Sequence, residues 1–336
     1  MGIALIRRAR ATAPVRLDFA GGWTDVPPFS SREGGMVVAA SICLSAEAEV
    51  IPGGDCLRLV ADDLNQVVKL KHHDDLVRDC GLPLLRAALR LFPPSGPLTL
   101  RTHSEAPAGS GLGSSGAIDV ALVAALAAAN NTALTIREIA DVACRLEADE
   151  ARIPGGRQDQ FSAAFGGFSV LRFRDPEARV ATLRLSDAFA AELARRTILC
   201  YTGASHFSGN TIARVMQGYE RGEGGIVAAL QRLRCVAQEM EEALRLEDLP
   251  RIGSLMAENW QRQQELDAAM CTPVMAALEA SLRAAGALGG KAAGSGAGGC
   301  MFFLAGDDVA AARRAAVEAG ARLLPVEWSW EGVRTW

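Results

Sequence analysis

The fold is decided by the stretch Pro107-Ala108-Gly109-Ser110-Gly111-Leu112-Gly113-Ser114-Ser115-Gly116, whose last eight residues include four glycines and three serines. The alternating run Leu98 to Thr102 before it predicts a strand, and the apolar run after it, to about Ala129, predicts a helix. Bare backbone amides in a glycine-rich turn at a helix N-terminus bind phosphate, and the hydroxyls of Ser114 and Ser115 can reach a metal ion held there. A tight turn feeding a buried helix is the simpler interpretation, but it does not require so many glycines and serines. The stretch therefore predicts a strand, a phosphate-binding loop and a helix in series.

Three better-known glycine motifs fit this loop poorly. The spacing Gly111-x-Gly113-x-x-Gly116 matches a dinucleotide fingerprint, but the residues about twenty positions later, Ala129 to Thr132, include no acid. A Walker loop needs a glycine-lysine-serine ending, and Gly290-Lys291 is followed by Ala292. A lipase-type nucleophile elbow needs a serine with glycine two residues to either side, which neither Ser114 nor Ser115 has.

The composition is that of an ordinary folded protein rather than a disordered or fibrous one. The chain has 336 residues, 49% of them hydrophobic and 22% charged, which allows one large domain or two moderate ones. A net charge of -4 gives no general attraction to nucleic acid or to an anionic membrane, so we expect small-molecule partners. The longest apolar run, Val120 to Ala129, is about half of the roughly 20 residues needed to cross a bilayer, and the N-terminus shows no secretory signal. We therefore expect a cytoplasmic protein, with the oligomeric state open and a homodimer among the alternatives.

The cysteines and histidines do not predict a metal site or a disulfide framework. The eight cysteines are scattered without a close pair, and we expect them to be buried free thiols. His72 and His73 lie in a charged run and His103 and His206 are isolated, so solvated or structural roles are expected for all four.

Strands and helices mix irregularly along the rest of the chain. We therefore expect an α+β fold rather than a doubly wound sheet, with a change of domain between residues 175 and 190. A glycine-dense turn is expected at Gly286 to Gly299. The expected strands are 15–20, 36–42, 57–60, 66–70, 98–102, 168–173, 197–201, 300–304 and 322–326, and the expected helices are 82–91, the run ending near 129, 135 to the proline at 154, 158–165, 226–246, 249–267 and 309–319.

Glu147 is a carboxylate in an unusual place. Thr135 to Glu138 forms a capping box, and the apolar residues of the helix that follows place Glu147 on the apolar stripe. A carboxylate there is costly unless something pairs with it. Pairing at the surface with Arg145 or Arg152 is one alternative.

Three segments resemble motifs of the GHMP small-molecule kinases, the family of galactokinase, homoserine kinase, mevalonate kinase and phosphomevalonate kinase. Pro107 to Gly116 resembles the phosphate-binding signature, Ala13 to Asp25 the N-terminal substrate motif, and Gly294 to Gly299 the C-terminal glycine loop. The segments follow the family's order and span nearly the whole chain. The resemblance implies an N-terminal domain at 1–180 with ribosomal-protein-S5-domain-2-like topology, a ferredoxin-like C-terminal domain at 181–336, and an active site in the cleft between them.

The resemblance also implies the residues that carry the chemistry. Asp159, in a stretch similar to the one holding the family's catalytic aspartate, would orient or deprotonate the attacking hydroxyl, with Arg16 between it and the phosphoryl group. A helix-capping role for Asp159 and a strand-edge salt bridge for Arg16 are the alternatives. Mg²⁺ would be held by Ser115 and Glu147. Only Lys69, Lys71 and Lys291 are lysines, so the phosphate charge falls to backbone amides, magnesium and arginine. The residues expected to bind ATP are Pro107, Gly109, Gly111, Leu112, Gly113, Ser114 and Ser115.

The substrate implied by the resemblance is polyhydroxylated. Asp25 matches the aspartate that binds sugar hydroxyls in galactokinase-like members, and a carboxylate suits a vicinal diol. Galactokinase has glutamate-histidine where this chain has Gly22-Trp23, which argues against galactose. Trp23 has two equal alternatives, stacking on a sugar face or packing in the core. The residues expected to contact substrate are Gly22, Trp23, Asp25, Gly156 and Gly296.

Two sugars compete as the substrate. Gly22 to Pro28 resembles L-fucose kinases. By contrast, Gly156 to Gln160, Tyr201 to Ser205 with Ser208 to Asn210, and Leu288 to Lys291 resemble D-glycero-D-manno-heptose 7-phosphate kinases. Both phosphorylate the anomeric C1 hydroxyl, and the length of a single kinase unit favours the heptose enzyme. We therefore predict a heptose 7-phosphate 1-kinase, with an L-fucose or other neutral-sugar kinase as the alternative.

Two alternative functions belong to other classes of protein. A catalytically silent regulator that binds sugar and ATP is disfavoured because Ser115, Glu147 and Asp159 occur together. An NAD-dependent oxidoreductase rests on the glycine spacing alone. For the 7-phosphate, Arg152, Arg157 and Lys291 are candidate cations by proximity to motifs, although each is more often a solvated charge.

Overall fold

The computed structural model describes residues 7–71, 73–78, 80–203 and 209–336. His72, His206 and the central part of the predicted motif Tyr201 to Asn210 lie outside the described residues. Within the described residues, no helix combines the length and the apolar character needed to cross a membrane.

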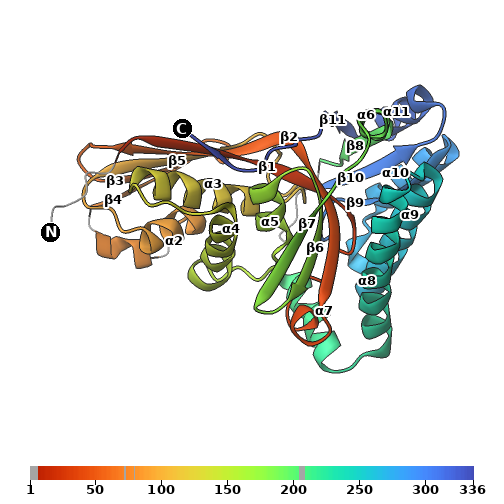
Figure 1. Cartoon of the computed structure of the whole chain (residues 1–336), viewed down its shortest axis with the longest axis horizontal. Helices are drawn as coiled ribbons and strands as arrows, with labels where there is room; N and C mark the ends of the chain where they lie inside the picture. The colour runs from red at the N-terminus through yellow and green to blue at the C-terminus, as the bar shows by residue number, and fades with distance from the viewer. Residues whose placement is uncertain (1–6, 72, 79, 204–208) are drawn as a thin grey trace.

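An eight-stranded mixed sheet forms the first half of the molecule, in the order β12-β1-β2-β5-β3-β4 with β6 and β7 continuing from β2 (Figure 1). All neighbours are antiparallel except β3 and β5. The long strand β2 pairs with β6 through its first half and with β5 through its second half, so it joins the two wings of the sheet. The strands are β1 (Ala9–Ala20), β2 (Gly35–Pro52), β3 (Leu57–Ala61), β4 (Gln66–Leu70), β5 (Leu98–Ser104), β6 (Phe168–Arg174), β7 (Glu177–Leu183) and β12 (Arg334–Thr335).

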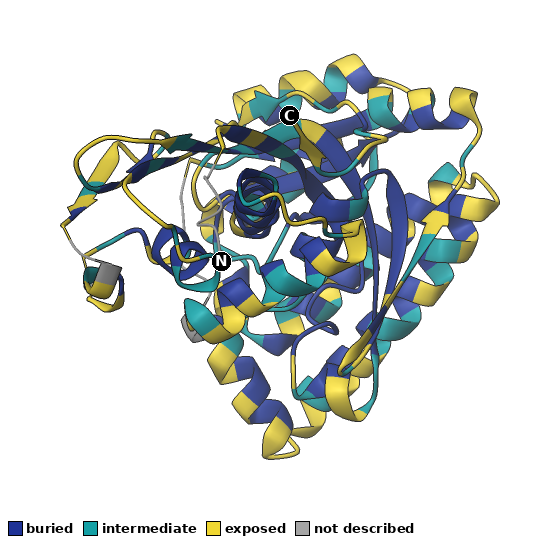
Figure 2. Ribbon diagram, turned by 60° about the vertical axis from the view of Figure 1, so that its left-hand side comes forward, coloured by how far each residue is buried: buried dark blue, intermediate teal, exposed yellow. Residues whose placement is uncertain are grey.

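Helices cover one face of this sheet, below it in Figure 1. They are α2 (Pro83–Leu91), α3 (Ser114–Ala129), α4 (Ile136–Arg145) and α5 (Gln158–Phe165), and a short helix α1 (Phe29–Arg32) follows β1. Helix α3 is apolar around its whole circumference because it lies between the sheet and the outer helices α4 and α5. Figure 2 shows the buried residues along the strands and the inner helix, with exposed residues on the outward faces. The predicted capping box at Thr135 and Glu138 is confirmed at the start of α4.

A four-stranded antiparallel sheet in the order β11-β8-β10-β9 forms the second half. Numbered along the chain, this order is 4-1-3-2 with helices after the first and third strands, which is the expected ferredoxin-like arrangement. The elements are α6 (Asp187–Arg196), β8 (Thr197–Tyr201), α7 (Gly209–Glu220), α8 (Gly224–Arg245), α9 (Leu249–Leu266), α10 (Pro273–Ala284), β9 (Ala287–Ala292), β10 (Cys300–Ala305), α11 (Val309–Glu318) and β11 (Arg322–Leu324).

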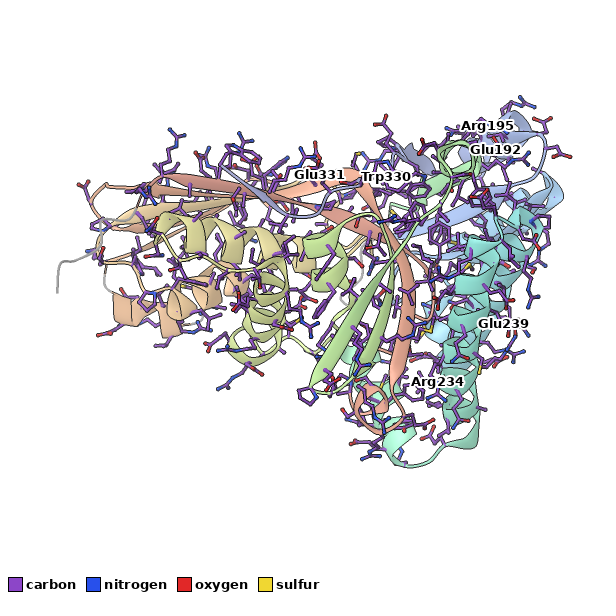
Figure 3. The ribbon with its side chains drawn as sticks, in the orientation of Figure 1. Glu192, Arg195, Arg234, Glu239, Trp330 and Glu331 are labelled. Atoms are coloured by element: carbon purple, nitrogen blue, oxygen red, sulfur yellow. The ribbon has the colours of Figure 1, made fainter. Side chains whose placement is uncertain are left out.

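Contacts on both sides of the molecule join the halves, in addition to those in the cavity described below. On one side, Arg234 of α8 lies beside the first sheet (Figure 3), donates a 2.6 Å hydrogen bond to the carbonyl of Glu33 and covers the ring of Phe29. On the other, the last segment of the chain, where Figure 3 labels Trp330 and Glu331, returns to the first sheet and pairs with β1 as β12. The domain division at 180/181 stays a prediction. Strand β7 of the first sheet continues to Leu183, beyond the predicted boundary, and the C-terminal segment returns from the second half to pair with the first sheet.

The expected glycine turn at 286–299 is wrong over its first half, where β9 (Ala287–Ala292) pairs with β10. Gly289 is required there because a Cβ would collide with the carbonyl of Gly253 on α9, so the glycines allow a helix and a strand to touch backbone to backbone. The elements expected from the sequence also lack α1, β7, α6, α7, α10 and β12, and the expected strands at β1 and β2 are too short.

The expectation of buried thiols is confirmed for only two cysteines. All eight are free, but Cys43 and Cys80 are exposed and four others are partly exposed, whereas Cys200 and Cys300 are buried in the second sheet. Of the other six, Cys43 lies on β2, Cys144 and Cys235 lie on helices, and Cys56, Cys80 and Cys271 lie between elements.

Gly289→Ala is expected to destabilise the protein by about 3 kcal/mol, because the methyl group would push α9 away from β9. Urea unfolding measures the change. The matched control is Gly225→Ala in the first turn of α8, where nothing lies within 4 Å of the new Cβ and the change should stay within about 1 kcal/mol. Equal stability of the two variants would contradict the close packing of α9 on β9.

Candidate active site

One cavity at the junction of the two halves collects residues from five distant parts of the chain. They come from the end of β1 and the loop after it, the glycine loop before α3, the segment from Glu147 to the start of α5, the first half of α7, and the loop between β9 and β10. Of the predicted site residues, Pro107 and Leu112 do not line it; the side chain of Leu112 lies in the hydrophobic core, so its part in the loop is structural. The predicted residues that line it are Arg16, Gly22, Trp23, Asp25, Gly109, Gly111, Gly113, Ser114, Ser115, Glu147, Gly156, Asp159 and Gly296.

The glycine loop presents polar groups that lack partners within the protein. Gly109, Gly111 and Gly113 all have positive φ angles, a conformation that other residues rarely adopt. Gly113 is the N-cap of α3 and supplies no side-chain cap. The hydroxyls of Ser110 and Ser114 are buried and have no hydrogen-bond partner among the described residues. Uncapped helix amides and two unpartnered hydroxyls fit the phosphates of ATP.

The loop between β9 and β10 packs against the glycine loop, backbone to backbone. The amide of Cys300 donates a 2.7 Å hydrogen bond to the carbonyl of Ser110. A Cβ on Gly294 would lie 2.7 Å from the carbonyl oxygen of Gly111, and one on Gly299 would lie 2.6 Å from that of Ser110. The glycines of the C-terminal loop are therefore needed for close approach of the two loops.

Arg16 is the cation at the centre of the cavity. Its Nε and Nη2 lie 2.8 and 2.7 Å from Oδ1 of Asp159, and its Nη1 donates to the carbonyls of Gly111 (2.7 Å) and Ala293 (2.8 Å). Only 4% of the residue is exposed. The salt bridge considered from the sequence exists, but it lies inside the cavity rather than at a strand edge, and it joins Asp159 to both glycine loops.

Asp159 lies in the first turn of α5, against the glycine loop. Cβ atoms on Gly113 and Gly116 would lie 3.0 Å from its Cγ and 2.5 Å from its Cβ, so these glycines make room for the aspartate. The N-cap of α5 is Arg157 and no side chain caps that helix. The helix-capping alternative for Asp159 is therefore not what the structure shows.

Glu147 points inward from a π-helical turn (Leu146–Glu150) at the end of α4. Such single π turns occur often at functional sites. The residue is 8% exposed, accepts a 2.6 Å hydrogen bond from Nε2 of Gln160 and is hydrogen-bonded to Ser115. Burial, followed by the charge of Asp159, raises the pKa of Glu147 to about 7. Within the described residues it makes no ion pair with Arg145 or Arg152, the surface alternative.

The hydroxyl of Ser115 and the carboxylate of Glu147 are the hard oxygen donors that Mg²⁺ prefers. No group of three or more acidic, histidine or cysteine side chains within the described residues could hold a metal ion by itself.

Asp25 also lines the cavity and is completely buried. Its Oδ2 accepts a 3.0 Å hydrogen bond from the amide of Gln158, and its Oδ1 lies 3.4 Å from Nε2 of the same residue. Gly156 is required beside it because a Cβ would overlap the carboxylate. Burial, followed by the nearby charges of Asp159 and Asp18, raises the pKa of Asp25 to about 6.

Trp23 packs in the core, one of the two roles that its sequence left open, and stacking on a sugar face stays a prediction. It is buried in a cluster with Val26 and Phe29, and it also lines the cavity. Its φ of 79° is unusual for a tryptophan and turns the chain sharply after Gly22. The indole Nε1 is buried without a partner among the described residues, which leaves it a donor for a ligand.

Three cationic residues are candidates from the sequence for binding the 7-phosphate of the sugar. Each of them either pairs with another residue of the protein or lies outside the cavity. Lys291 is fully buried and bonded to Asp18, and Arg157 pairs with Asp175 and donates to the carbonyl of Pro176. Arg152 is exposed and does not line the cavity. None of the three lines the cavity, so the described structure does not support them as ligands of a phosphate bound there.

Polar residues in or beside the cavity that are not among those predicted from the sequence include Asp18, Ser110, Asp119, Gln158 and Gln160. Asp18 could have been found, because it lies two positions after Arg16 in an otherwise apolar strand and so faces the same side. Asp119 is fully buried in α3, and burial, followed by the charge of Glu147, raises its pKa well above the usual range. The two glutamines lie in α5, and no pattern in the sequence around them indicates a role in the site.

Two family models match the chain. The one described as "GHMP kinases N terminal domain" matches residues 81–167, and the one described as "GHMP kinases C terminal" matches residues 240–322. Together they cover about half of the sequence, including the glycine loop, Glu147 and the loop before β10.

Individual relatives and a solved structure agree with these matches. The chain is 29% identical over 309 residues to the D-glycero-alpha-D-manno-heptose 7-phosphate kinase of Campylobacter jejuni, with 89% of each protein covered. It is 27% identical to the bifunctional fucokinase/GDP-fucose pyrophosphorylase of Arabidopsis thaliana, covering 90% of this chain and 30% of that protein. A D-glycero-D-manno-heptose 1-phosphate kinase from Bacteroides thetaiotaomicron has a similar structure, with a TM-score of 0.79, 24% identity and 98% of both chains covered. The expected two-domain α+β fold is confirmed.

Asp25→Asn is expected to stabilise the unliganded protein at pH 7.5 but not at pH 4. The folded state keeps the proton of Asp25 up to its pKa of about 6, whereas the unfolded chain loses it near 3.8. Wild-type stability therefore falls as the pH rises between these values, by about 3 kcal/mol, and asparagine removes this fall. Urea unfolding at several pH values measures the difference, with Asp149→Asn on the exposed side of the π turn as the control. A difference that is the same at every pH would contradict the prediction.

Proposed function

The chain belongs to the GHMP kinase family, and we propose from this premise that it transfers the γ-phosphoryl group of ATP to the anomeric hydroxyl of a sugar, with D-glycero-D-manno-heptose 7-phosphate as the leading substrate. Magnesium as the cofactor and the cytoplasm as the site of action are parts of the same proposal. A homodimer stays a prediction.

The observation that carries the proposal is the set of hydrogen bonds made by Arg16. One guanidinium joins Asp159 to the carbonyl of Gly111 in the phosphate loop, so a hydroxyl beside the aspartate lies next to bound phosphates. Phosphoryl transfer depends on this kind of positioning and on neutralising charge, more than on covalent participation by the protein.

Asp159 is the group that handles the proton of the attacking hydroxyl. Both contacts with Arg16 fall on Oδ1, which leaves Oδ2 to accept a hydrogen bond from the sugar. The carboxylate orients the hydroxyl oxygen toward the phosphoryl group and receives its proton as the new bond forms. Arg16 meanwhile keeps a positive charge beside the oxygen atoms on which negative charge grows.

Ser115 and Glu147 would hold the magnesium ion, which supplies further neutralisation of the phosphate charge. Gln160 fixes the carboxylate of Glu147 through its 2.6 Å hydrogen bond. The raised pKa of Glu147 describes the site without a cation, and a cation beside the carboxylate favours its ionised form.

L-Fucose is the second candidate, favoured by the apolar part of the cavity wall. Val26, Ile153 and Ile212 line the cavity in addition to the polar residues, and apolar side chains suit the methyl group of a 6-deoxy sugar. The fucokinase relative supports the same alternative. A silent regulator is disfavoured, because Arg16, Ser115, Glu147 and Asp159 all meet in one cavity.

The proposal predicts ADP release with ATP, Mg²⁺ and heptose 7-phosphate, and a loss of about a thousandfold or more in kcat for Asp159→Asn, because the amide cannot accept the proton. A coupled ADP assay with heptose 7-phosphate, L-fucose, D-mannose and D-galactose measures both. Phosphorus NMR of the product identifies a phosphate on C1.

Each outcome of this panel has a consequence. Turnover of L-fucose but not of the heptose phosphate would replace the leading substrate by the second candidate. No ADP release above the Asp159→Asn background with any sugar would reject the kinase proposal, and ATP and sugar binding by calorimetry would then favour the silent regulator.

Glu147→Gln is expected to raise the Mg²⁺ concentration for half-maximal activity by at least about tenfold, because a neutral amide is a weaker ligand for the ion. Titration of Mg²⁺ at saturating sugar measures this, and the KM for sugar should change little. Asp149→Asn, a charge removed from the same turn at an exposed position, is the matched control. An unchanged Mg²⁺ requirement in Glu147→Gln would contradict the assignment.

A further inference from the structure

Asp18 is a buried carboxylate in the cavity that the roles described above leave without a function. It lies on β1 two residues after Arg16, lines the cavity and is 2% exposed. Its Oδ1 is buried and has no hydrogen-bond partner among the described residues. Leaving a buried charged oxygen unpaired is costly, so an oxygen of this kind at a cavity wall indicates a ligand that donates to it.

Lys291 holds the other side of this carboxylate. The lysine reaches across from β9 with its side chain completely buried, and its Nζ donates to the carbonyls of Asp18 (2.6 Å) and Ala292 (2.9 Å) and lies 3.2 Å from Oδ2 of Asp18. An ammonium group has three protons, and these three oxygens use all of them. The ion pair therefore satisfies Oδ2 and leaves Oδ1 as the open acceptor.

Gly22 makes the space that the carboxylate of Asp18 occupies. A Cβ at position 22 would overlap Oδ2 of Asp18 and lie 3.4 Å from Nε2 of Gln158, the residue that also contacts Asp25. The two carboxylates are close enough for the charge of Asp18 to contribute to the raised pKa of Asp25. Two neighbouring acceptors at one end of a cavity suit a ligand with several hydroxyl groups.

We propose that Asp18 is a second sugar-binding carboxylate, which accepts a hydrogen bond from a substrate hydroxyl other than the one bound by Asp25, with Lys291 as the residue that positions it. The proposal rests on the sugar-kinase function and adds a residue that determines which hydroxyl pattern is accepted. A lock between the two halves of the molecule, without substrate contact, is the competing explanation of the ion pair.

The test compares wild type with Asp18→Asn, which keeps the shape of the side chain and an oxygen for Lys291 but removes the charge. The KM for heptose 7-phosphate should rise about 10- to 100-fold, the range for loss of a hydrogen bond to a charged group, while the KM for ATP stays within about twofold. A structural lock would instead lower the melting temperature and change both KM values together.

Deoxy forms of heptose 7-phosphate, each lacking one hydroxyl at C2, C3 or C4, sharpen the test. Wild type should discriminate strongly against the analogue lacking the hydroxyl bound by Asp18, and Asp18→Asn should lose that discrimination at one position only. Gly22→Ala, whose methyl group displaces the same carboxylate, should reproduce this pattern if Asp18→Asn does not fold.

The outcomes separate this inference from the function on which it rests. Wild-type turnover of heptose 7-phosphate combined with unchanged sugar KM and unchanged discrimination in both variants would overturn the role of Asp18 alone. Absence of turnover with every sugar of the panel would reject the kinase function, and the inference would fall with it.

Discussion

The buried guanidinium of Arg16 is the interaction on which the site depends. It contacts Asp159, the carbonyl of Gly111 and the carbonyl of Ala293, so a single side chain fixes an acid, the phosphate loop and the opposite glycine loop relative to one another. A rigid fork with several donors can do this, whereas an ammonium group on a flexible stem cannot fix the same geometry. The cavity is therefore organised before any ligand arrives, which lowers the reorganisation required at the transition state.

Glycine is required in this protein for two reasons, a positive φ angle or close packing against a neighbouring group. Only the first of these is recognisable from the sequence. Gly109, Gly111 and Gly113 give the positive φ angles of a phosphate loop, and that spacing is recognisable in a single sequence. Gly116, Gly156 and Gly289 are instead required by what lies opposite them: Asp159, Asp25 and the backbone of α9. These partners are distant along the chain, so no local pattern distinguishes such glycines from turn residues. This is why a strand was mistaken for a turn at β9.

The difference between a local pattern and a contact with distant residues also explains which site residues could be predicted. Glu147 stands out because a carboxylate on an apolar stripe needs a chemical reason, whereas Asp159 and Asp25 are indicated by the resemblance of their segments to motifs of the GHMP kinases. Asp18 and Lys291 form an ion pair across 273 positions, and each looks ordinary in its own segment. The glutamines of α5 are similar, since Gln160 acquires its role only through contact with Glu147. Residue type and spacing indicate the chemistry, whereas the support around it depends on the tertiary fold.

The hydrogen bond between Arg16 and Ala293 joins residues 277 positions apart. Contacts of such long sequence separation form late in folding, because the entropy of closing the loop is lost before the contact is gained. The cavity is therefore complete only when both halves have folded and docked. A ligand whose contacts require both halves stabilises both of them together, because it binds the folded and docked state alone.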